Sequence, residues 1–282
     1  MARMNRCIPF IVAMSVLLLS GTSVATTVLE TWESESNGAF DGTTASNVWL
    51  GDATSFFIDS ANWPVSPTPN FAGNHSLRSP TSTAVLNLTT VTSISGAFDA
   101  TQTMQWSVFV SGGSQSITST PRDFSLILMS SSSTAADIES GSINGYRLRL
   151  GDNPALGASS DSLLFEEANG SGWSTLTNIA LPGADRSINE GWNLLVQRTA
   201  AGVFTYGFAN GAIGTGVPLS FSTTDTTVTS ALFAGMNYRT PVTGDNAFGF
   251  DNFRVATVPE PATLALLGLG IAGLGFARRR KP

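Results

Sequence analysis

Apolar and polar side chains alternate through the middle of this chain, and this two-residue period limits its fold more than any other feature. In 146–150, Tyr and Leu occupy one parity, while Arg147 and Arg149 occupy the other. Similar alternation occurs at Met104, Trp106, Val108 and Val110, and at Phe124, Leu126 and Leu128. Successive side chains of a β-strand point to opposite faces of its sheet, so these runs predict strands with one buried face.

Turn-forming residues separate the alternating runs. They occur at 111–113, 130–133, 151–154 and 169–172, where Gly, Ser, Asn and Pro are concentrated. No amphipathic helix of normal length is evident between them. Short strands with frequent turn signals predict an all-β, antiparallel sandwich.

The charge of the interior excludes one class of partner. The chain has a formal net charge of −6, and its first 25 residues contribute +2 while the segment from Pro259 onward contributes +3. The middle therefore carries −11 and contains no Lys. Such a domain repels phosphate backbones, so nucleic acid is not an expected partner.

Sulfur and imidazole chemistry are also limited. Cys7 is the single cysteine and lies near the N-terminus, and His75 is the single histidine. Disulfide stapling of the middle and catalytic sites that need several imidazoles are therefore excluded. Stability must come from a buried core, with bound ions as a further source.

The N-terminus is typical of a secretory signal peptide over 1–25. Arg3 and Arg6 precede the apolar run 8–19, and small residues at Ser23 and Ala25 predict cleavage after Ala25 by the secretion machinery. The alternative is a membrane anchor, for which the apolar run is short.

Three features follow one another in the C-terminal segment 258–282. Pro259, Glu260 and Pro261 come first, and the uncharged stretch 262–277 follows. The basic cluster Arg278, Arg279, Arg280 and Lys281 then ends the segment. A transmembrane helix over 262–277 would be about 24 Å long, slightly shorter than a ~30 Å hydrocarbon core. The basic cluster would stay in the cytoplasm.

This three-part segment resembles the PEP-CTERM sorting signal of Gram-negative bacteria. The resemblance implies processing by an exosortase, a membrane-embedded protease, near 259–261. It also implies an exported protein that is transiently anchored in the inner membrane and then reaches the cell surface or the extracellular space. Proteins with this tail tend to occur with extracellular polysaccharide machinery. A plain single-pass anchor is the alternative.

The middle segment 26–257 is expected to be one β-sandwich domain. Within it, 191–198 and 203–208 flank a glycine-containing loop and predict a hairpin. The hairpin, with supporting runs at 73–78, 232–236 and 248–255, resembles laminin-G-like and concanavalin A-like jelly rolls. The fold predicted for the whole chain is this jelly-roll sandwich, flanked by a signal helix and a transmembrane helix.

The closing run 248–255 changes phase. Phe248 and Phe250 share one parity while Phe253 and Val255 share the other, which predicts either a central strand buried on both faces or a bulge near Asp251.

Asp251 also belongs to a candidate metal site. The jelly-roll resemblance implies adjacent first and last strands, and hence a structural Ca²⁺ held by Glu30 or Glu33 together with Asp251. The alternative is that Asp251 accepts backbone hydrogen bonds or pairs with an arginine such as Arg254.

No catalytic residues are expected. Glu166 and Glu167 are adjacent, so a strand points them to opposite faces, and they cannot by themselves form the acid pair of a glycosidase. Arg147 and Arg149 share a face, where they either clamp an acidic sugar or pair with Glu166 or Glu167.

Sugar rings stack on exposed aromatic side chains. Trp106 and Trp192 are expected in the core, whereas Trp49, Trp63 and Trp173 stand in polar or turn-rich stretches. Trp63 is the best candidate for contact with carbohydrate.

The predicted function is that of a non-enzymatic protein of the cell surface or biofilm matrix. Its role there is either structural or the binding of exopolysaccharide. The alternatives are a glycan-acting hydrolase or lyase on a jelly-roll fold, and a purely structural or adhesive matrix protein.

Overall fold

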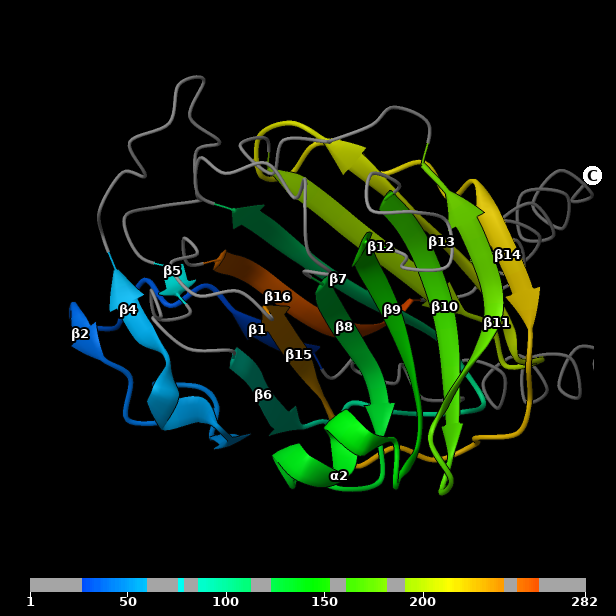
Figure 1. Ribbon diagram of the computed structural model, residues 1–282, viewed down its shortest axis with the longest axis horizontal. Coiled ribbons are helices and arrows are strands. Elements are labelled where there is room, and N and C mark those ends of the chain that lie inside the picture. Colours follow the sequence, from blue (N-terminus) through cyan, green and yellow to red (C-terminus); the bar gives the residue numbers. More distant parts are fainter. Residues whose placement is uncertain are drawn as a thin grey trace, which may run out of the picture.

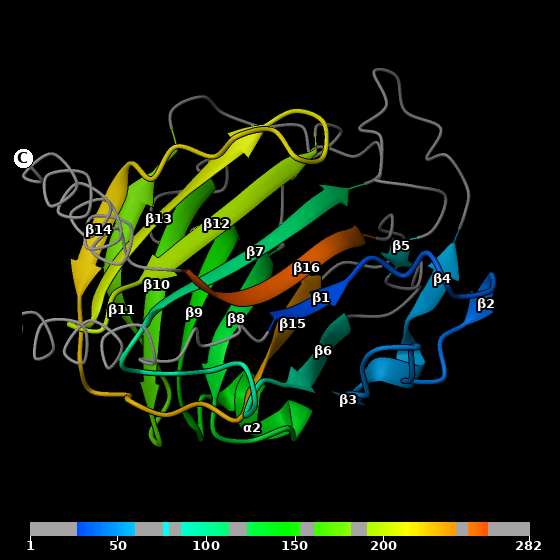
Figure 2. The same cartoon turned by 180° about the vertical axis from the view of Figure 1, so that it is seen from behind.

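The computed structural model describes residues 27–59, 76–78, 86–112, 123–152, 161–181, 191–240 and 248–258. Over these residues the chain forms two antiparallel sheets that pack face to face (Figures 1 and 2). The predicted antiparallel sandwich is therefore confirmed. The predicted signal helix and transmembrane helix lie outside the described residues. Among the described residues, no helix is long and apolar enough to cross a membrane.

One sheet has nine strands among the described residues. In spatial order they are β14 (Phe221–Thr224), β13 (Val203–Asn210), β12 (Trp192–Arg198), β7 (Thr103–Gly112), β16 (Phe248–Val258), β5 (Ser76–Arg78), β4 (Phe57–Asp59) and β2 (Gly38–Ala39), with β1 (Thr27–Glu30) also paired to β16.

The other sheet has seven described strands. In spatial order they are β11 (Trp173–Ala180), β10 (Asp161–Asn169), β9 (Asn144–Asp152), β8 (Asp123–Ser130), β15 (Phe233–Thr240), β6 (Leu86–Ser93) and β3 (Trp49–Gly51). Two short helices accompany the strands, the 3-10 turn η1 (Ala53–Ser55) and the helix α2 (Ala135–Ser140).

The alternating apolar residues fill the space between the sheets. All of the residues singled out from β7, β8 and β9 for this face are buried in one core cluster: Met104, Trp106, Val108, Val110, Phe124, Leu126, Leu128, Tyr146 and Leu148, with Leu150 packed against it. Aromatic rings join the two layers, since Phe204 of β13 lies 4.8 Å, between ring centroids, from both Tyr146 and Phe165. The period read from the sequence thus defines the core.

A second, smaller cluster explains the position of α2. Ile138 of α2 packs with buried residues that point away from the main core, namely Val91, Ile127, Ile143 and Ala168. The helix therefore covers one end of the outer face of the seven-stranded sheet, as Figure 1 shows. Beyond α2, most of the described residues that line a cleft on that outer face are polar, with Leu164 as the apolar exception.

The predicted hairpin is confirmed. β12 and β13 pair antiparallel from Trp192↔Asn210 to Arg198↔Phe204. Gly202 in the connecting loop has φ +77°, and a Cβ there would lie 2.6 Å from the carbonyl oxygen of Asp225. The loop therefore requires glycine for both its conformation and its close packing.

The phase change in the closing strand is produced by a bulge in a central strand. The register of β16 against β7 shifts between Asp251 and Arg254, and Asn252 has φ +51°. The inserted residue turns Phe253 and Val255 to the same side as Phe250, so all three are buried in the core. β16 also pairs with β1, so the first and last described strands are neighbours, as expected.

Candidate functional site

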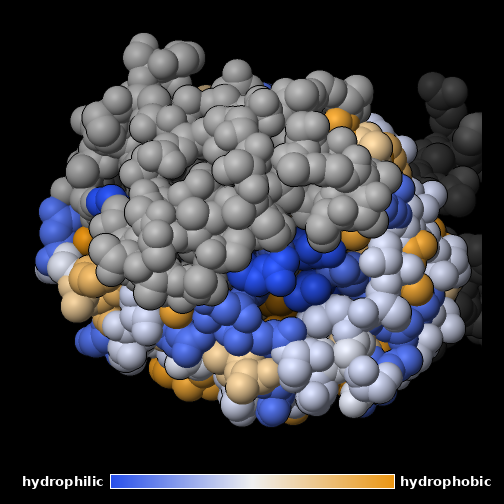
Figure 3. All heavy atoms as spheres, in the orientation of Figure 1, coloured by the Kyte–Doolittle hydropathy of each residue, from blue (hydrophilic) through white to orange (hydrophobic). Residues whose placement is uncertain are grey.

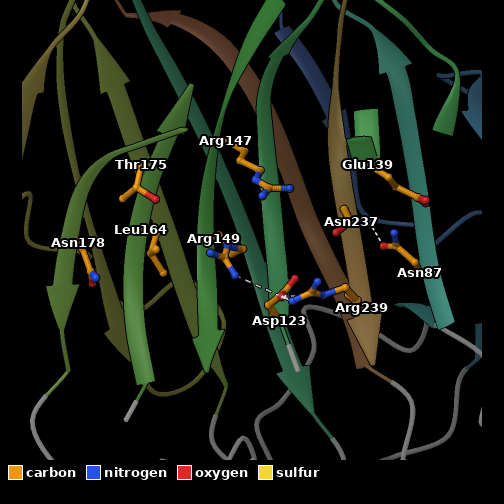
Figure 4. A pocket seen from close by; sticks show the side chains of 10 residues that line it. All are labelled: Asn87, Asp123, Glu139, Arg147, Arg149, Leu164, Thr175, Asn178, Asn237 and Arg239. Carbon is orange, nitrogen blue, oxygen red and sulfur yellow. Dashed lines mark hydrogen bonds and ion pairs between the residues drawn. The ribbon is translucent and has the colours of Figure 1, made fainter. Parts of the chain in front are cut away.

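A cleft of about 460 Å³ opens on the outer face of the seven-stranded sheet. Figure 3 shows strongly hydrophilic residues gathered in a hollow on this face. The volume lies within the range usual for small-molecule sites, roughly 300–1,000 Å³. Figure 4 shows the side chains that line the cleft: Asn87, Asp123, Glu139, Arg147, Arg149, Leu164, Thr175, Asn178, Asn237 and Arg239.

Strand register brings the charged residues of the cleft together. Arg147 of β9 stands opposite Glu166 of β10, and Arg239 of β15 stands opposite Asp123 of β8. Directly opposed residues of an antiparallel pair have their Cβ atoms about 5 Å apart on one face. The alternation that buries Tyr146 and Leu148 therefore also presents Arg147 and Arg149 to the cleft.

Five charged residues of the cleft form a continuous ionic network. Glu166 accepts from Arg147 Nε at 2.7 Å and from Arg149 Nε at 3.1 Å. Asp123 Oδ2 lies 3.4 Å from Arg149 Nη1 and 2.7 Å from Arg239 Nη2. Arg149 thus links the two carboxylates, and three guanidinium groups share two acids. The ionic network, defined as Arg147, Arg149, Arg239, Glu166 and Asp123, has a formal charge of +1.

The members of the ionic network differ in how far their side chains are exposed to solvent. The side chains of Glu166 and Asp123 are only 4% and 3% exposed, whereas that of Arg239 is 43% exposed. Burial alone would raise the pKa of Glu166, but Arg147 and Arg149 outweigh it and lower that pKa. Glu166 is therefore a buried, ionised anchor, and Arg239 is the cation most open to solvent.

Arg147 is held from a second side by an aromatic ring. Its Cζ lies 4.1 Å from the centre of the Trp173 ring, a cation–π contact. The indole N–H of Trp173 donates to the carbonyl of Ile138 at 2.7 Å. This contact ties the ring on β11 to α2, so Arg147 is positioned by three separate elements.

The far end of the cleft is built from amides and acids. Asn237 Nδ2 donates to Asn87 Oδ1 at 2.9 Å and to Thr89 Oγ1 at 2.9 Å. Thr89 Oγ1 in turn donates to Glu139 Oε1 at 3.3 Å, and Thr89 N donates to Asp52 Oδ2 at 3.0 Å. Burial, with the nearby charge of Asp52, raises the pKa of Glu139. This end is polar and carries negative charge.

The structure resolves the two predictions for Arg147 and Arg149 in part. Their pairing with Glu166 is confirmed, and Glu167 is on the opposite side of β10, where burial and Asp225 raise its pKa. Sequence reasoning missed Arg239. The alternation of Met236 and Tyr238 with Asn237 and Arg239 was the signal that would have found it.

Sequence reasoning also missed Asp123 and Glu139. Asp123 shares the parity of Ser125 and Ile127 in β8, which face away from the core residues Phe124 and Leu126. Glu139 had no periodic signal, because it belongs to a helix of a single turn and a half.

The predicted calcium ligands take separate positions. The carboxylate of Glu30 accepts from the amides of Thr31 and Trp32, from the Thr44 hydroxyl, and from Asn47 Nδ2 at 2.9 Å. Asp251 is fully buried and accepts from the amide of Asn252 at 2.6 Å. Glu33 is exposed in the turn after β1.

Glu30 stands opposite Phe253, two residues from Asp251. Among the described residues, no group of three or more His, Cys, Asp or Glu side chains is arranged to hold a metal ion. The calcium site stays a prediction.

The tryptophans are distributed as follows. Trp106 and Trp192 are buried, as predicted. Trp49 is also buried, with its ring centroid 5.3 Å from that of Phe253, despite its polar neighbours in sequence. Trp63, His75, Ala25 and the sorting residues Pro259, Glu260, Pro261, Arg278, Arg279 and Arg280 lie outside the described residues, so their roles stay predictions.

Three solved structures illustrate what the chain is similar to. Two are mutants of alginate lyase Aly36B, in complex with alginate tetrasaccharide and trisaccharide. They have TM-scores of 0.52 and 0.51 and identities of 14% and 12%, and the alignments cover 83% of this chain and 97% and 99% of the lyase chains. The third is the carbohydrate-binding module CBM66 from Bacillus subtilis, with TM-score 0.40, 12% identity, and coverage of 73% and 96%.

At these identities the likeness to the lyase is one of fold. No curated protein matches the chain in sequence. The PEP-CTERM protein-sorting motif matches residues 257–281. The chain therefore carries a PEP-CTERM sorting tail behind an antiparallel sandwich domain, and is an exported protein.

Proposed function

We propose that the sandwich domain is a non-catalytic carbohydrate-binding domain of a surface or matrix protein, and that its cleft binds an acidic polysaccharide. The observation that carries this proposal is the unequal ionic network. Three arginines face two buried carboxylates in an open cleft, and Arg239 is 43% exposed. One positive charge is therefore left for a ligand.

The chemistry of the arginines fits a uronate. A guanidinium group donates two parallel hydrogen bonds to a carboxylate, and Arg239 is the member of the ionic network most accessible to one. Arg149, held between Glu166 and Asp123, lies next to it. The fold likeness to a lyase that binds alginate, itself an acidic polysaccharide, supports the same class of ligand.

The carboxylates of the ionic network favour binding over catalysis. Both Glu166 and Asp123 are buried and occupied by arginines, and the pKa of Glu166 is lowered. A general acid or base works best when its pKa lies near the working pH, which this environment opposes for Glu166. The alternatives, a hydrolase or lyase and a purely structural matrix protein, are outcomes of the test below.

Delivery belongs to the same proposal. The sorting tail is processed by an exosortase-type protease after export through the secretion machinery. The protein is anchored transiently in the inner membrane by 262–277 and then reaches the cell surface or the extracellular matrix. There, an acidic exopolysaccharide is the partner of the cleft.

The test is calorimetric titration of the protein with an oligomer of a uronic acid and with a neutral glucan oligomer. We expect binding of the acidic oligomer only. Arg239→Gln should weaken it about tenfold, because a charged hydrogen-bonded contact is lost. Arg254→Gln is the matched control, because Arg254 is exposed on β16 of the other sheet. The substitution changes the net charge by the same amount as Arg239→Gln.

Three results would contradict the proposal. Equal weakening by both variants would show that net charge, not the cleft, attracts the ligand. Binding of no glycan would favour the structural alternative. Release of shortened oligosaccharides would favour the enzyme.

A further inference from the structure

The cleft has two chemically different ends. Resting on the proposed function, we infer that it selects an alternating polysaccharide, with an acidic sugar at the ionic network and a neutral sugar next to it beside Glu139. A polymer in which every sugar is acidic is the disfavoured ligand.

Strand order separates Arg147 and Arg149 from the other end of the cleft, whereas Arg239 lies on β15, two positions from Asn237. Arg149 lies on β9 and Asn237 on β15, with β8 between them. Neighbouring strands are about 4.8 Å apart, so the two residues are about 10 Å apart across the sheet. Figure 4 shows Arg147 and Arg149 in the middle of the cleft, Arg239 next to Asp123, and Glu139 beyond Asn237, toward β6. A polysaccharide that crosses the strands therefore meets the two ends with different sugars.

The ionic network accommodates one carboxylate. Its formal charge is +1, because Glu166 and Asp123 already take up two of the three guanidinium charges. A single uronate balances the remainder. A second uronate would have no cation of its own among the described residues that line the cleft.

The other end repels a second carboxylate. Glu139 and Asp52 reach Thr89 from two sides, through its hydroxyl and its amide nitrogen. Glu139 lines the cleft, and its carboxylate accepts hydrogen bonds. A sugar hydroxyl can donate to it, whereas an ionised uronate cannot and adds like-charge repulsion. The neighbouring amides of Asn87 and Asn237 add uncharged polar groups suited to hydroxyls.

The experiment compares two acidic probes of equal length on the full-length protein. One alternates glucuronate with N-acetylglucosamine, and the other is oligogalacturonate. Calorimetry gives the ratio of their dissociation constants. The wild-type protein should prefer the alternating probe. Glu139→Gln should shift the ratio of the two dissociation constants about threefold in favour of oligogalacturonate, the effect expected for one partly screened charge.

Two further variants make the result specific. Asp52→Asn should shift the ratio in the same direction as Glu139→Gln, which keeps the test valid if one variant folds poorly. Glu35→Gln removes the same charge in the turn after β1, where Glu35 accepts from the Ser34 hydroxyl, and should leave the ratio unchanged.

The failure of this inference differs from the failure of the proposed function. If both probes bind equally and Glu139→Gln and Asp52→Asn leave the ratio unchanged, the alternating selectivity is wrong while the binding function stands. If neither probe binds, the proposed function fails and this inference fails with it.

Discussion

Glu166 is the residue on which the cleft's electrostatics depend. It is one carboxylate, 4% exposed, that accepts from two arginines and from the Thr175 hydroxyl at 3.4 Å. Removing charges from water is costly, and here the cost is offset by hydrogen bonds to a charged partner on each side. Because Arg147 and Arg149 are only 12% and 14% exposed, they depend on Glu166 for compensation.

We therefore predict that Glu166→Gln lowers the free energy of unfolding by about 2 kcal/mol, since it removes the carboxylate that pairs with Arg147 and leaves Arg149 paired with Asp123. Urea denaturation followed by tryptophan fluorescence measures this change. Glu35→Gln, at a more exposed position, should have an effect within about 0.5 kcal/mol. Equal effects of the two substitutions would mean that Glu166 and its two arginines behave as a solvated surface ion pair does.

At the scale of elements, one side chain of β9 fixes the connection between β14 and β15. The hydroxyl of Tyr146 donates to Asp225 and accepts from the amide of Val228 at 3.0 Å. Asp225 also accepts from the amide of Thr227 at 2.7 Å. The connection from one sheet to the other is thus tied to the core strand that carries Arg147 and Arg149.

The hydrogen bonds to Asp225 should make the stability of the folded protein depend on pH. Burial alone would raise the pKa of Asp225, but hydrogen bonds from Tyr146 and Thr227 outweigh it and lower that pKa. A carboxyl with a lowered pKa in the folded state adds stability above its unfolded value, ~3.9, and loses it as pH falls through the folded value. The melting temperature of the wild type should therefore exceed that of Asp225→Asn at neutral pH, and the gap should narrow below about pH 4.

Tyr146→Phe tests the same hydrogen bond by removing its donor. It removes the hydroxyl and with it one cause of the lowered pKa of Asp225, so its melting temperature should be less sensitive to acid than that of the wild type. Thermal melts followed by circular dichroism from neutral to acid pH measure both variants. A gap between wild type and Asp225→Asn that stays constant with pH would contradict this interpretation.

The elements also show why the fold could be predicted and the complete cleft could not. The alternation in β9 is local, so a stretch such as 146–150 reveals both its buried and its open face. The ionic network is non-local, because Arg239 and Asp123 are 116 positions apart in sequence and meet only through the pairing of β15 with β8. Likewise, Trp49 has polar neighbours in sequence and becomes a core residue only against Phe253.

At the scale of the whole molecule, the domain and the ionic network in its cleft have net charges of opposite sign. The segment 26–258 carries a formal charge of −11, whereas the ionic network carries +1. An acidic polysaccharide is thus repelled at long range and attracted at contact, and salt screens the long-range part within about 8–10 Å at physiological strength. We predict that moderate salt accelerates association with an acidic glycan, measurable by stopped-flow fluorescence. Slower association on adding salt would contradict this expectation and indicate net attraction.

The sorting tail supports a prediction at the same scale. The motif at 257–281 joins a Pro-Glu-Pro group to an uncharged segment and a basic cluster, and a protease that reads this order should require the first part. Intact mass measurement of the protein from its native host should therefore show loss of the C-terminal segment. Replacing Pro259, Glu260 and Pro261 with alanine should leave that segment attached, because the uncharged stretch and basic cluster still hold it at the membrane. Glu35→Gln serves as the control for processing, and unchanged processing of the alanine variant would identify the segment as a plain anchor.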